Sequence, residues 1–553
     1  MTQLKTPADI SAKERPVAIL WYLLLSGLSL LLVSSQLDCA EDLSITGPGP
    51  GMTVDEPFNV GQGVFLVRAL RVYGLGIFAP ESLREIFEHP NYLPDHPPLG
   101  RFLIGVAHES IAGLAGEDSR PFVVTYGRYA SAVCFACLVF LVGWFTYQRA
   151  GHTGAMIAAG SLLALPRLLG HAHLAVLEMP TALFYLLAVL AVVQFWDGEQ
   201  VPSKKRACLT GILLGLALLT KIQAVLIPIP VILWAIWKWR QNALLPLMCW
   251  GGVGVLVFFL GWPWLWFDPV GHLSEYLGRT TGRAALYVEY FGTKYADRDL
   301  PWHYAWVMLL TTVPVGLLIC SGFGVSKLWR DFKTEQQRPT GELLILLSLL
   351  WPLILFTLPG ITVYDGVRLF LMVFPLLAIL IGLGAAIVTD WLTRRFSQRI
   401  AITAVTLLML SQFTGSILYA PCWLSYYSLL LGGLNGANQL GMEATYWGDS
   451  LSADLLGEVV QEVPDNSIIQ IAPILHPAWL QMLQETPEIK RKGIQLVPFE
   501  PERPVSQYVM YFQRNPYLPE LLQTQSSDRW TVIKEVTRQQ VALGRLVSLK
   551  EAR

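Results

Sequence analysis

Residues 367–388 are VRLFLMVFPLLAILIGLGAAIV, an apolar stretch in which Arg368 is the one charged side chain. A helix of about 20 apolar residues is long enough to cross the hydrocarbon core of a bilayer. Similar stretches recur along the chain, and the shorter ones are near the lower limit of length for a span. The candidate spans are residues 16–35, 121–146, 153–170, 175–196, 207–220, 222–237, 243–263, 304–325, 343–359, 367–388 and 400–419. The sequence therefore predicts about eleven membrane-spanning helices.

The composition indicates a membrane protein and excludes a nucleic-acid partner. Of the 553 residues, 53% are hydrophobic and 15% are charged, whereas an average soluble domain has roughly 25% charged residues. The 40 Lys and Arg residues balance 41 Asp and Glu residues to a net charge of -1, so no positive field is available to hold a polyanion. Most of the 7 cysteines fall inside apolar stretches, which predicts neither a disulfide framework nor a zinc site.

The loops between the predicted spans differ in charge from one side of the membrane to the other. With the N-terminus in the cytoplasm, every short inside loop is basic, whereas the short outside loops hold only Arg167, Lys221 and Arg368. Basic loops favour the cytoplasmic side. The first span, 16–35, is longer than the core of a cleaved signal peptide and is interpreted as a signal anchor. An odd number of spans then places the C-terminus outside.

The segments outside the apolar stretches divide the chain into two predicted domains. Residues 1–419 form the transmembrane domain, in which residues 36–120 are a first outside loop with juxtamembrane helices. Residues 420–553 are richer in Asp, Glu, Gln and Pro, which predicts a small soluble α/β domain on the outer face. Its expected elements are a helix over 449–463, a strand over 467–472, a helix over 476–485 and a strand over 505–512.

Ionisable residues next to the predicted spans are candidates for function, because each costs a few kcal/mol at membrane depth. The predicted topology places all of them at the outer surface. They are Asp55, Glu56, His96, Arg128, Arg167, His171, His173, Glu178, Lys221, Asp365 and Arg368. Any one of these side chains could instead reach the interface or pair locally. Their common side of the membrane is the argument that they form a site.

Carboxylates beside Lys and Arg at head-group depth suit a reaction on a lipid that carries a phosphate. In a polyprenyl-phosphate sugar, cations can stabilise the phosphate as it leaves, and a carboxylate can accept the proton of the attacking hydroxyl. The acceptor then arrives from the aqueous side while the lipid stays in the bilayer. The carboxylates and imidazoles near Asp55 are also ligands that a divalent metal ion accepts, so metal dependence stays open.

Five sequence elements, in order along the chain, carry a resemblance to a known family. They are Asp55-Glu56, the segment His96-Pro97-Pro98-Leu99, Arg128 within Gly127-Arg128-Tyr129-Ala130, the segment Leu174 to Pro180, and the segment Gly215 to Lys221. Together they resemble the membrane glycosyltransferases related to protein O-mannosyltransferases and lipid A aminoarabinose transferases. The resemblance covers roughly residues 16–450 and places the chain with bacterial members.

The resemblance implies a GT-C fold and an inverting transfer from a polyprenyl-phosphate sugar. It assigns the general base to Asp55, with Glu56 in support. The expected substrate-binding residues are His96, Arg128, Arg167, His173, Glu178, Lys221, Asp365 and Arg368. The chain departs from the family pattern at Glu178, where the family has Asp. It also lacks room between residues 264 and 303 for the lumenal β-trefoil module of eukaryotic protein mannosyltransferases, which weakens the case for a protein acceptor.

The favoured function is therefore transfer of a single mannose-like hexose or aminosugar to an extracytoplasmic hydroxyl or lipid. The acceptor is a lipid, a glycan or a protein, and the protein is expected to span the bacterial inner membrane with its site facing the periplasm. One alternative is a polysaccharide polymerase or ligase that uses a lipid-linked oligosaccharide. A second is a transporter or flippase, although transport sites lie at the bilayer midplane rather than at one face. A third is a membrane anchor without enzymatic activity.

Overall fold

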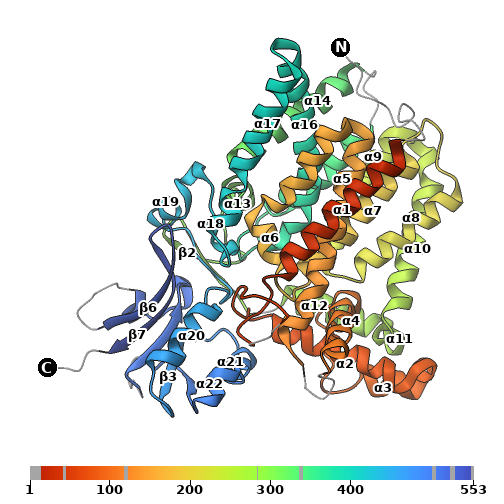
Figure 1. Ribbon diagram of the computed structural model, residues 1–553. Coiled ribbons are helices and arrows are strands. Elements are labelled where there is room, and N and C mark those ends of the chain that lie inside the picture. The colour runs from red at the N-terminus through yellow and green to blue at the C-terminus, as the bar shows by residue number, and fades with distance from the viewer. Residues whose placement is uncertain are drawn as a thin grey trace.

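The computed structural model describes residues 14–41, 45–116, 122–282, 284–334, 340–500, 506–523 and 530–549. Its helices form one large bundle, and a mixed β-sheet lies at one end of this bundle, close to the C-terminus (Figure 1). The predicted fold class, a helical membrane protein of many spans with a small C-terminal α/β part, is confirmed. The ends of the predicted loop 36–120 include residues outside the described ranges.

The centre of the bundle is built from α5 (Val124–Leu163), α14 (Val315–Thr334) and α16 (Phe374–Arg395). Small residues let these helices approach closely, as is common between helices in membranes. A Cβ atom on Gly382 would lie 2.5 Å from the backbone oxygen of Gly154, and one on Gly384 would lie 1.8 Å from that of Cys320. Larger residues at Gly382 or Gly384 would therefore force the helices apart.

The remaining elements of the bundle lie around these three helices. They are α1 (Glu14–Ser34), α6 (Pro166–Ala172), α7 (Glu178–Trp196), α8 (Lys204–Leu218), α9 (Pro228–Trp239), α10 (Leu244–Gly261), α11 (Trp264–Phe267), α12 (Pro269–Thr281), α13 (Tyr304–Thr312), α15 (Gly341–Leu355), α17 (Gln398–Gln412), α18 (Thr414–Leu418) and α19 (Gly433–Gln439). Short 3-10 segments connect several of them, including η3 (Ile222–Leu226) and η5 (Arg368–Val373).

Seven helical segments of the described residues are long and apolar enough to cross a membrane, or eight if the bent pair α13–α14 is one span. Two of the seven are 40 residues long, and each covers two of the predicted spans. In α5 the two parts meet at Gly151, whose φ of 68° interrupts the helix. The expected total of about eleven spans, and the orientation of the chain, stay predictions.

The first outside segment folds into α2 (Glu56–Tyr73), η2 (Gly74–Phe78), α3 (Pro80–Phe87) and α4 (Pro98–Ala115). The expected helix after Asp55 is present. The far end of α2 and the η2 segment that follows it leave Val72, Leu75 and Phe78 largely exposed. Exposed apolar side chains at this position suit contact with lipid. The near end of α2 faces the rest of the bundle and is buried.

The C-terminal part holds a five-stranded sheet of order β4-β3-β5-β7-β6. The central strand β5 (Tyr508–Phe512) pairs in parallel with β3 (Ile468–Ala472) and antiparallel with β7 (Val541–Leu549). The edge strands are β4 (Gln495–Pro498) and β6 (Trp530–Arg538), and the helices of this part are α20 (Ala453–Glu462), α21 (Pro477–Gln484), α22 (Pro487–Arg491) and α23 (Glu520–Gln523). We call β3 to β7 with these helices the C-terminal sheet.

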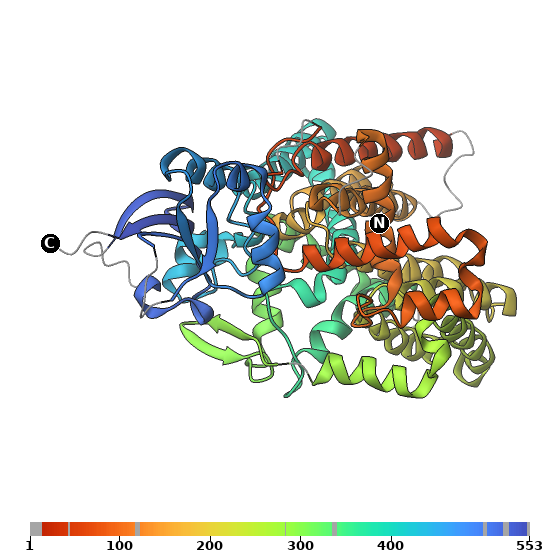
Figure 2. The same ribbon diagram turned by 90° about the horizontal axis from the view of Figure 1, so that it is seen from below.

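Four elements expected in the C-terminal part correspond to α20, β3, α21 and β5. The strand predicted over 505–512 begins at residue 508 in the structure, and residue 505 lies outside the described ranges. A small hairpin was not predicted. It consists of β1 (Tyr287–Tyr290) and β2 (Thr293–Ala296), and it lies beside the C-terminal sheet (Figure 2). Tyr287 donates its backbone N–H to the hydroxyl of Tyr517 at 2.8 Å.

Candidate active site

One polar cavity of about 220 Å³ lies where several elements of the bundle begin. Asp55 precedes α2, Glu178 opens α7, and Lys221 and Arg368 flank or begin the 3-10 segments η3 and η5. Carboxylates are stabilised at the N-termini of helices. The lining residues are Asp55, Phe58, Asn59, Asp95, His96, Arg101, Leu177, Glu178, Lys221, Leu286, Tyr364 and Arg368. The cavity therefore brings together five of the predicted site residues.

Arg368 is the centre of the charged groups in this cavity. Its guanidinium contacts the carboxylate of Asp55, donates to Glu178 at 2.9 Å and donates to Asp365 at 3.0 Å. The side chain of Arg368 is 9% exposed, whereas that of Asp55 is 34% exposed. Charge-assisted hydrogen bonds of this kind fix geometry as well as adding energy. Asp55 is thus oriented by a buried cation while part of its carboxylate stays open to the cavity.

Lys221 is the second cation of the cavity, and its Nζ donates to Glu178 at 2.6 Å. Burial lowers the pKa of Lys221, and the positive charge of Arg368 acts in the same direction. The charge of Glu178 raises the pKa of Lys221 and thus opposes both effects. The Glu178 carboxylate forms ion pairs with two cations, Lys221 and Arg368. The family resemblance predicts Asp at position 178. The longer side chain of Glu178 reaches both Lys221 and Arg368.

His96 contributes a neutral imidazole to the cavity. Burial lowers the pKa of His96 to about 3, so the ring is uncharged at neutral pH. Among the described residues, its Nδ1 atom is buried without a hydrogen-bond partner. A buried polar atom without a partner is costly. His96 therefore offers an unused hydrogen-bonding atom beside the charged groups.

Asn59, Asp95 and Arg101 form a polar cluster among the lining residues that were not predicted as site residues. Arg101 donates to both carboxylate oxygens of Asp95, at 2.6 and 3.0 Å, and to Asn59 at 3.3 Å. Burial acts to raise the pKa of Asp95, but the charge and hydrogen bond of Arg101, together with His96 and a backbone hydrogen bond, outweigh it and lower this pKa to about 2. Arg101 lies two residues after the segment His96-Pro97-Pro98-Leu99, so its closeness to that motif was the signal that could have identified it.

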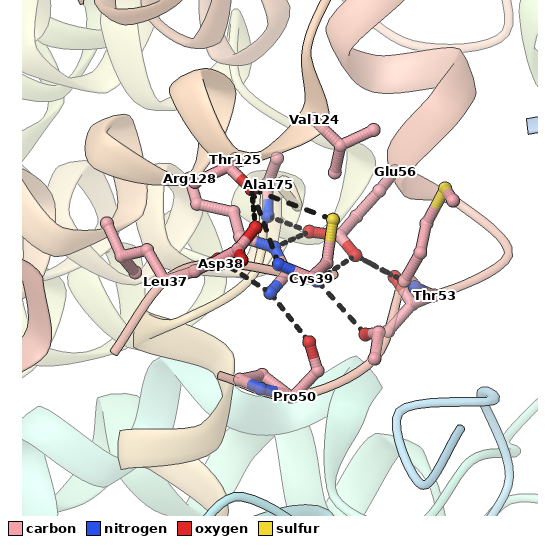
Figure 3. Close-up of polar contacts among 12 residues, drawn as sticks. Leu37, Asp38, Cys39, Pro50, Thr53, Glu56, Val124, Thr125, Arg128 and Ala175 are labelled. Carbon is pink, nitrogen blue, oxygen red and sulfur yellow. Dashed lines mark hydrogen bonds and ion pairs between the residues drawn. The ribbon is translucent and has the colours of Figure 1, made fainter. Parts of the chain in front are cut away.

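Glu56 and Arg128 form a fully buried ion pair (Figure 3). Neither side chain lines the cavity. Arg128 donates two hydrogen bonds to Glu56, both at 2.7 Å. Its other N–H groups donate to the backbone oxygens of Leu37, Pro50 and Gly51. All of its donors are thus used within the protein. The structure corrects one expectation, because Arg128 has no N–H left for a donor phosphate.

The Glu56–Arg128 pair instead fixes the loop that carries Asp55. Glu56 also accepts from the backbone N–H groups of Thr53 and Ala175, at 2.8 and 2.7 Å. We predict that Arg128→Met destabilises the protein by about 3–5 kcal/mol, because it leaves a carboxylate buried without its cation. Thermal unfolding of the purified protein measures this. The double variant Arg128→Met with Glu56→Met should unfold at a higher temperature than Arg128→Met alone, and the opposite order would contradict the assignment.

Arg167 and His173 also lie away from the cavity, contrary to expectation. Arg167 donates to the backbone oxygen of Tyr426 at 3.1 Å, and its guanidinium lies 4.7 Å from the ring centre of Tyr427. His173 stacks on Trp423 with ring centres 4.1 Å apart, and its Nδ1 lies 2.8 Å from the backbone oxygen of Leu169. Both residues pack the segment that follows α18 against α6, so the structure gives them a packing role rather than contact with a substrate.

Asp365 is buried beneath Arg368 and does not line the cavity. Its second oxygen accepts from Arg514 of the C-terminal sheet at 2.9 Å. Arg514 was not predicted, because 149 residues separate it from Asp365 in the sequence. The expected direct contact of Asp365 with a substrate is thus replaced by contacts with two arginines.

Glu443 is a buried carboxyl group near the same arginines. Its nearest cation is Arg514, at 3.6 Å, and it faces Arg167, Asp365 and Glu289. Burial raises the pKa of Glu443 from 4.5 to about 8, and Asp365 and Glu289 act in the same direction while Arg514 opposes them. Glu443 is therefore protonated in the folded protein at neutral pH. The charge of Arg514 is then balanced chiefly by Asp365.

This shift in the Glu443 pKa has a consequence for stability. Because the folded protein holds the proton that the unfolded chain releases, the contribution of Glu443 is fully present below about pH 4.5 and is lost as the pH rises towards 8. The expected slope is about 1.4 kcal/mol per pH unit. The unfolding temperature of the wild type should therefore fall relative to that of Glu443→Gln as the pH rises from 5 to 8. A difference between the two proteins that is independent of pH would refute this.

Within the part of the chain that the structure describes, no group of three or more His, Cys, Asp and Glu side chains is arranged to hold a metal ion. The two histidines His171 and His173 each use Nδ1 on a backbone oxygen one turn earlier, at 2.8 Å. Neither imidazole lines the cavity.

Part of the sequence and the fold of the whole chain are similar to known proteins. Residues 95–267 match the family described as dolichyl-phosphate-mannose-protein mannosyltransferase. No curated protein sequence matches the chain. Among solved structures, the chain is similar to ArnT from Cupriavidus metallidurans in the apo state, with 14% identity, a TM-score of 0.51, and coverage of 96% of this chain and 97% of that chain. It also matches the oligosaccharyltransferase of Archaeoglobus fulgidus at 12% identity and a TM-score of 0.44, covering 90% of this chain and 68% of that one.

The structural likeness to ArnT shows the fold of this chain, and the family match over residues 95–267 supports its resemblance to membrane glycosyltransferases with the GT-C fold. The resemblance found in the five sequence elements is thereby confirmed.

Proposed function

We propose that the protein transfers a single sugar from a polyprenyl-phosphate donor to an acceptor hydroxyl, with inversion at the anomeric carbon. The observation that carries the proposal is the Asp55–Arg368 contact at the edge of the cavity. A carboxylate that is 34% exposed lies against a buried cation, with a second cation, Lys221, on the shared partner Glu178. A base and a phosphate clamp within one cavity are the two parts that such a transfer needs.

In this proposal Asp55 is the general base. It accepts the proton of the acceptor hydroxyl as that oxygen attacks the anomeric carbon, and the bond from that carbon to the phosphate oxygen breaks. Arg368 and Lys221 stabilise the charge that develops on the departing lipid phosphate. Glu178 keeps both cations in place, and neutral His96 offers a hydrogen bond to the sugar or the phosphate. The sequence-based roles of Arg128 and Arg167 are not part of this proposal.

An apolar groove next to the cavity suits the lipid portion of the donor. The groove measures about 340 Å³, and its lining residues Leu99 and Leu219 lie within three residues of the cavity residues His96 and Lys221 in the sequence. Its other lining residues are Leu66, Leu70, Ile77, Phe78, Leu83, Phe87, Pro98, Phe102, Leu260, Gly261 and Pro263. A polyprenyl chain in this groove would place its phosphate beside Lys221. The description of the matched family names a donor of this type, a lipid phosphate that carries a sugar.

The proposal also includes the place of the protein in the cell and its division into domains. Residues 1–419 would form the catalytic membrane domain and residues 420–553 an extracytoplasmic domain, with the site facing the periplasm of a bacterial inner membrane. The basic inside loops support this orientation. The C-terminal sheet lies at one end of the bundle (Figure 1), and its Arg514 donates to Asp365, the partner of the cavity residue Arg368. The acceptor would be a lipid, a glycan or a protein.

A panel of donors tests the proposal. The purified protein in lipid nanodiscs is incubated with polyprenyl-phosphate monosaccharides, a polyprenyl-diphosphate oligosaccharide and sugar nucleotides, together with a membrane extract as the source of acceptor. Release of free polyprenyl phosphate from a monosaccharide donor alone is the expected result. Release of polyprenyl diphosphate from the oligosaccharide donor alone would favour a polymerase or ligase. Passage of a donor across the bilayer without release would favour a flippase.

A further inference from the structure

We propose that the C-terminal sheet is part of the catalytic apparatus, because its residue Arg514 positions Arg368 on Asp55 by way of Asp365. Arg514 is thus a positioning residue rather than a catalytic one. This inference rests on the proposed function, since the position that matters is that of Arg368 against the proposed base. The C-terminal sheet would then position residues of the site and not only cover it.

Arg514 lies where the central strand of the sheet ends. It follows β5 after one residue, and its side chain is 4% exposed. The guanidinium donates to Asp365 at 2.9 Å and to the backbone oxygen of Tyr446 at 2.6 Å. It also lies 4.8 Å from the ring centre of Tyr517. A buried side chain held by these contacts has little freedom, so it can fix its partner Asp365.

Asp365 joins the two arginines through its two oxygen atoms. One oxygen accepts from Arg514 at 2.9 Å, and the other accepts from Arg368 at 3.0 Å. The backbone of Asp365 has a φ of +55°, and that of Gly366 has a φ of +65°. A non-glycine residue with positive φ persists only where its surroundings hold it. The turn is held by Tyr304, whose hydroxyl accepts from the N–H of Gly366 at 3.0 Å.

Arg368 transmits this arrangement to the cavity. One guanidinium group contacts Asp365 on one side and Asp55 with Glu178 on the other. Without Arg514, the carboxylate of Asp365 would have Arg368 as its remaining cation and would be free to rotate. Arg368 would then be less firmly held on Asp55 and Glu178. Displacements of about 1 Å in a reacting group can cost on the order of 100-fold in rate.

A second, independent set of contacts positions Asp55, the partner of Arg368 in the cavity. The loop before Asp55 receives a hydrogen bond from Trp479 of α21, whose Nε1 donates to the backbone oxygen of Met52 at 2.9 Å. Gly51 donates its N–H to the backbone oxygen of Asp449 at 2.7 Å. A Cβ atom on Gly51 would lie 2.3 Å from the backbone oxygen of Leu451, so the two segments are in close contact. Both Asp55 and Arg368 are therefore positioned from the C-terminal side.

Kinetics of full-length variants in nanodiscs test the proposal. We expect Arg514→Gln to lower kcat by roughly 10- to 100-fold, with a donor KM within threefold of the wild type. Arg514→Lys, which keeps the charge, should recover part of the loss. The matched control is Arg545→Gln, which removes a guanidinium of the same sheet that pairs with Glu535 across β6 and β7, at 3.1 Å. Unchanged kcat in Arg514→Gln would overturn the proposal.

A double variant separates positioning from a general loss of structure. If Arg514 acts only through Asp365, the variant that combines Arg514→Gln with Asp365→Asn should have the same kcat as Asp365→Asn alone. If the losses of kcat in Arg514→Gln and Asp365→Asn multiply in the double variant, the proposal is overturned. It is also overturned if kcat follows the unfolding temperature across all variants, including the control Arg545→Gln.

The wild type and Asp55→Asn, run beside these variants, report on the proposed function itself. If the wild type transfers no sugar from any donor, the proposed function has failed. The contacts that link Arg514 to Asp55 through Asp365 and Arg368 are then tested by thermal unfolding. Non-additive shifts in unfolding temperature between Arg514→Gln and Asp55→Asn would still support the chain of contacts through Asp365 and Arg368. Additive shifts would overturn it.

Discussion

Asp55→Asn is expected to lower the rate of sugar transfer by roughly 10²- to 10⁴-fold, which is the usual contribution of a general base. The substitution replaces a carboxylate by an amide of nearly equal volume, so the cavity keeps its shape. Arg368 would keep its bonds to Glu178 and Asp365, at 2.9 and 3.0 Å. Folding should therefore be retained while the proton acceptor is lost.

The rate of product formation at saturating donor measures this effect. Asp390→Asn is the matched control, because it makes the same chemical change at an exposed position near the end of α16 and does not line the cavity. We expect the control to keep the wild-type rate. Activity of Asp55→Asn above about a tenth of the wild type would rule out Asp55 as the base.

Lys221→Met is expected to lower kcat/KM for the donor by roughly 10- to 100-fold, the range of a lost hydrogen bond to a charged group. The methionine fills the space of the lysine stem without its charge. Glu178 would retain Arg368 as its cation, at 2.9 Å, so the carboxylate would not be left unpaired. The loss should therefore appear in the handling of the donor phosphate rather than in folding.

Separate titrations of donor and acceptor check the assignment of Lys221. The KM for the donor should rise, and the KM for the acceptor should stay within about twofold of the wild type. Lys238→Met is the control, since Lys238 forms an ion pair with Asp197 at 2.9 Å away from the cavity. An equal rise in both KM values would assign Lys221 to the support of the cavity as a whole.

The sequence predicted the helical bundle well because apolar stretches are a local signal. The stretch that contains Arg368 became η5 and α16, and the stretch after Glu178 became α7. The number of spans is harder to predict. Apolar stretches on either side of Gly151 form one 40-residue helix with a break, and hydropathy alone does not distinguish this from two helices.

The site was partly predictable for a similar reason. Ionisable residues near spans mark functional positions, and Asp55, His96, Glu178, Lys221 and Arg368 do meet in one cavity. The same signal selected Arg128, whose donors are all used by Glu56 and by backbone oxygens. Residue type and depth do not reveal whether carbonyl groups converge on a guanidinium, because that depends on how distant loops fold.

Arg514 shows the other limit of prediction from sequence. It lies in a part of the chain with ordinary soluble composition, and nothing near it in the sequence indicates a role in the membrane domain. Its importance follows from one tertiary contact, the 2.9 Å hydrogen bond to Asp365. Long-range contacts between a soluble module and a membrane site have no local pattern, so they become visible only in the structure.

The most direct test of the central claim is a single-turnover measurement with the donor that the panel identifies. Wild type and Asp55→Asn are each loaded with an equal amount of bound donor, the acceptor is added, and free polyprenyl phosphate is followed together with the glycosylated product. We expect the wild type to release polyprenyl phosphate at the same rate as it forms glycosylated product. In Asp55→Asn, at equal donor occupancy, we expect this release to be at least about 100-fold slower. Equal rates of release from the two proteins would contradict this expectation.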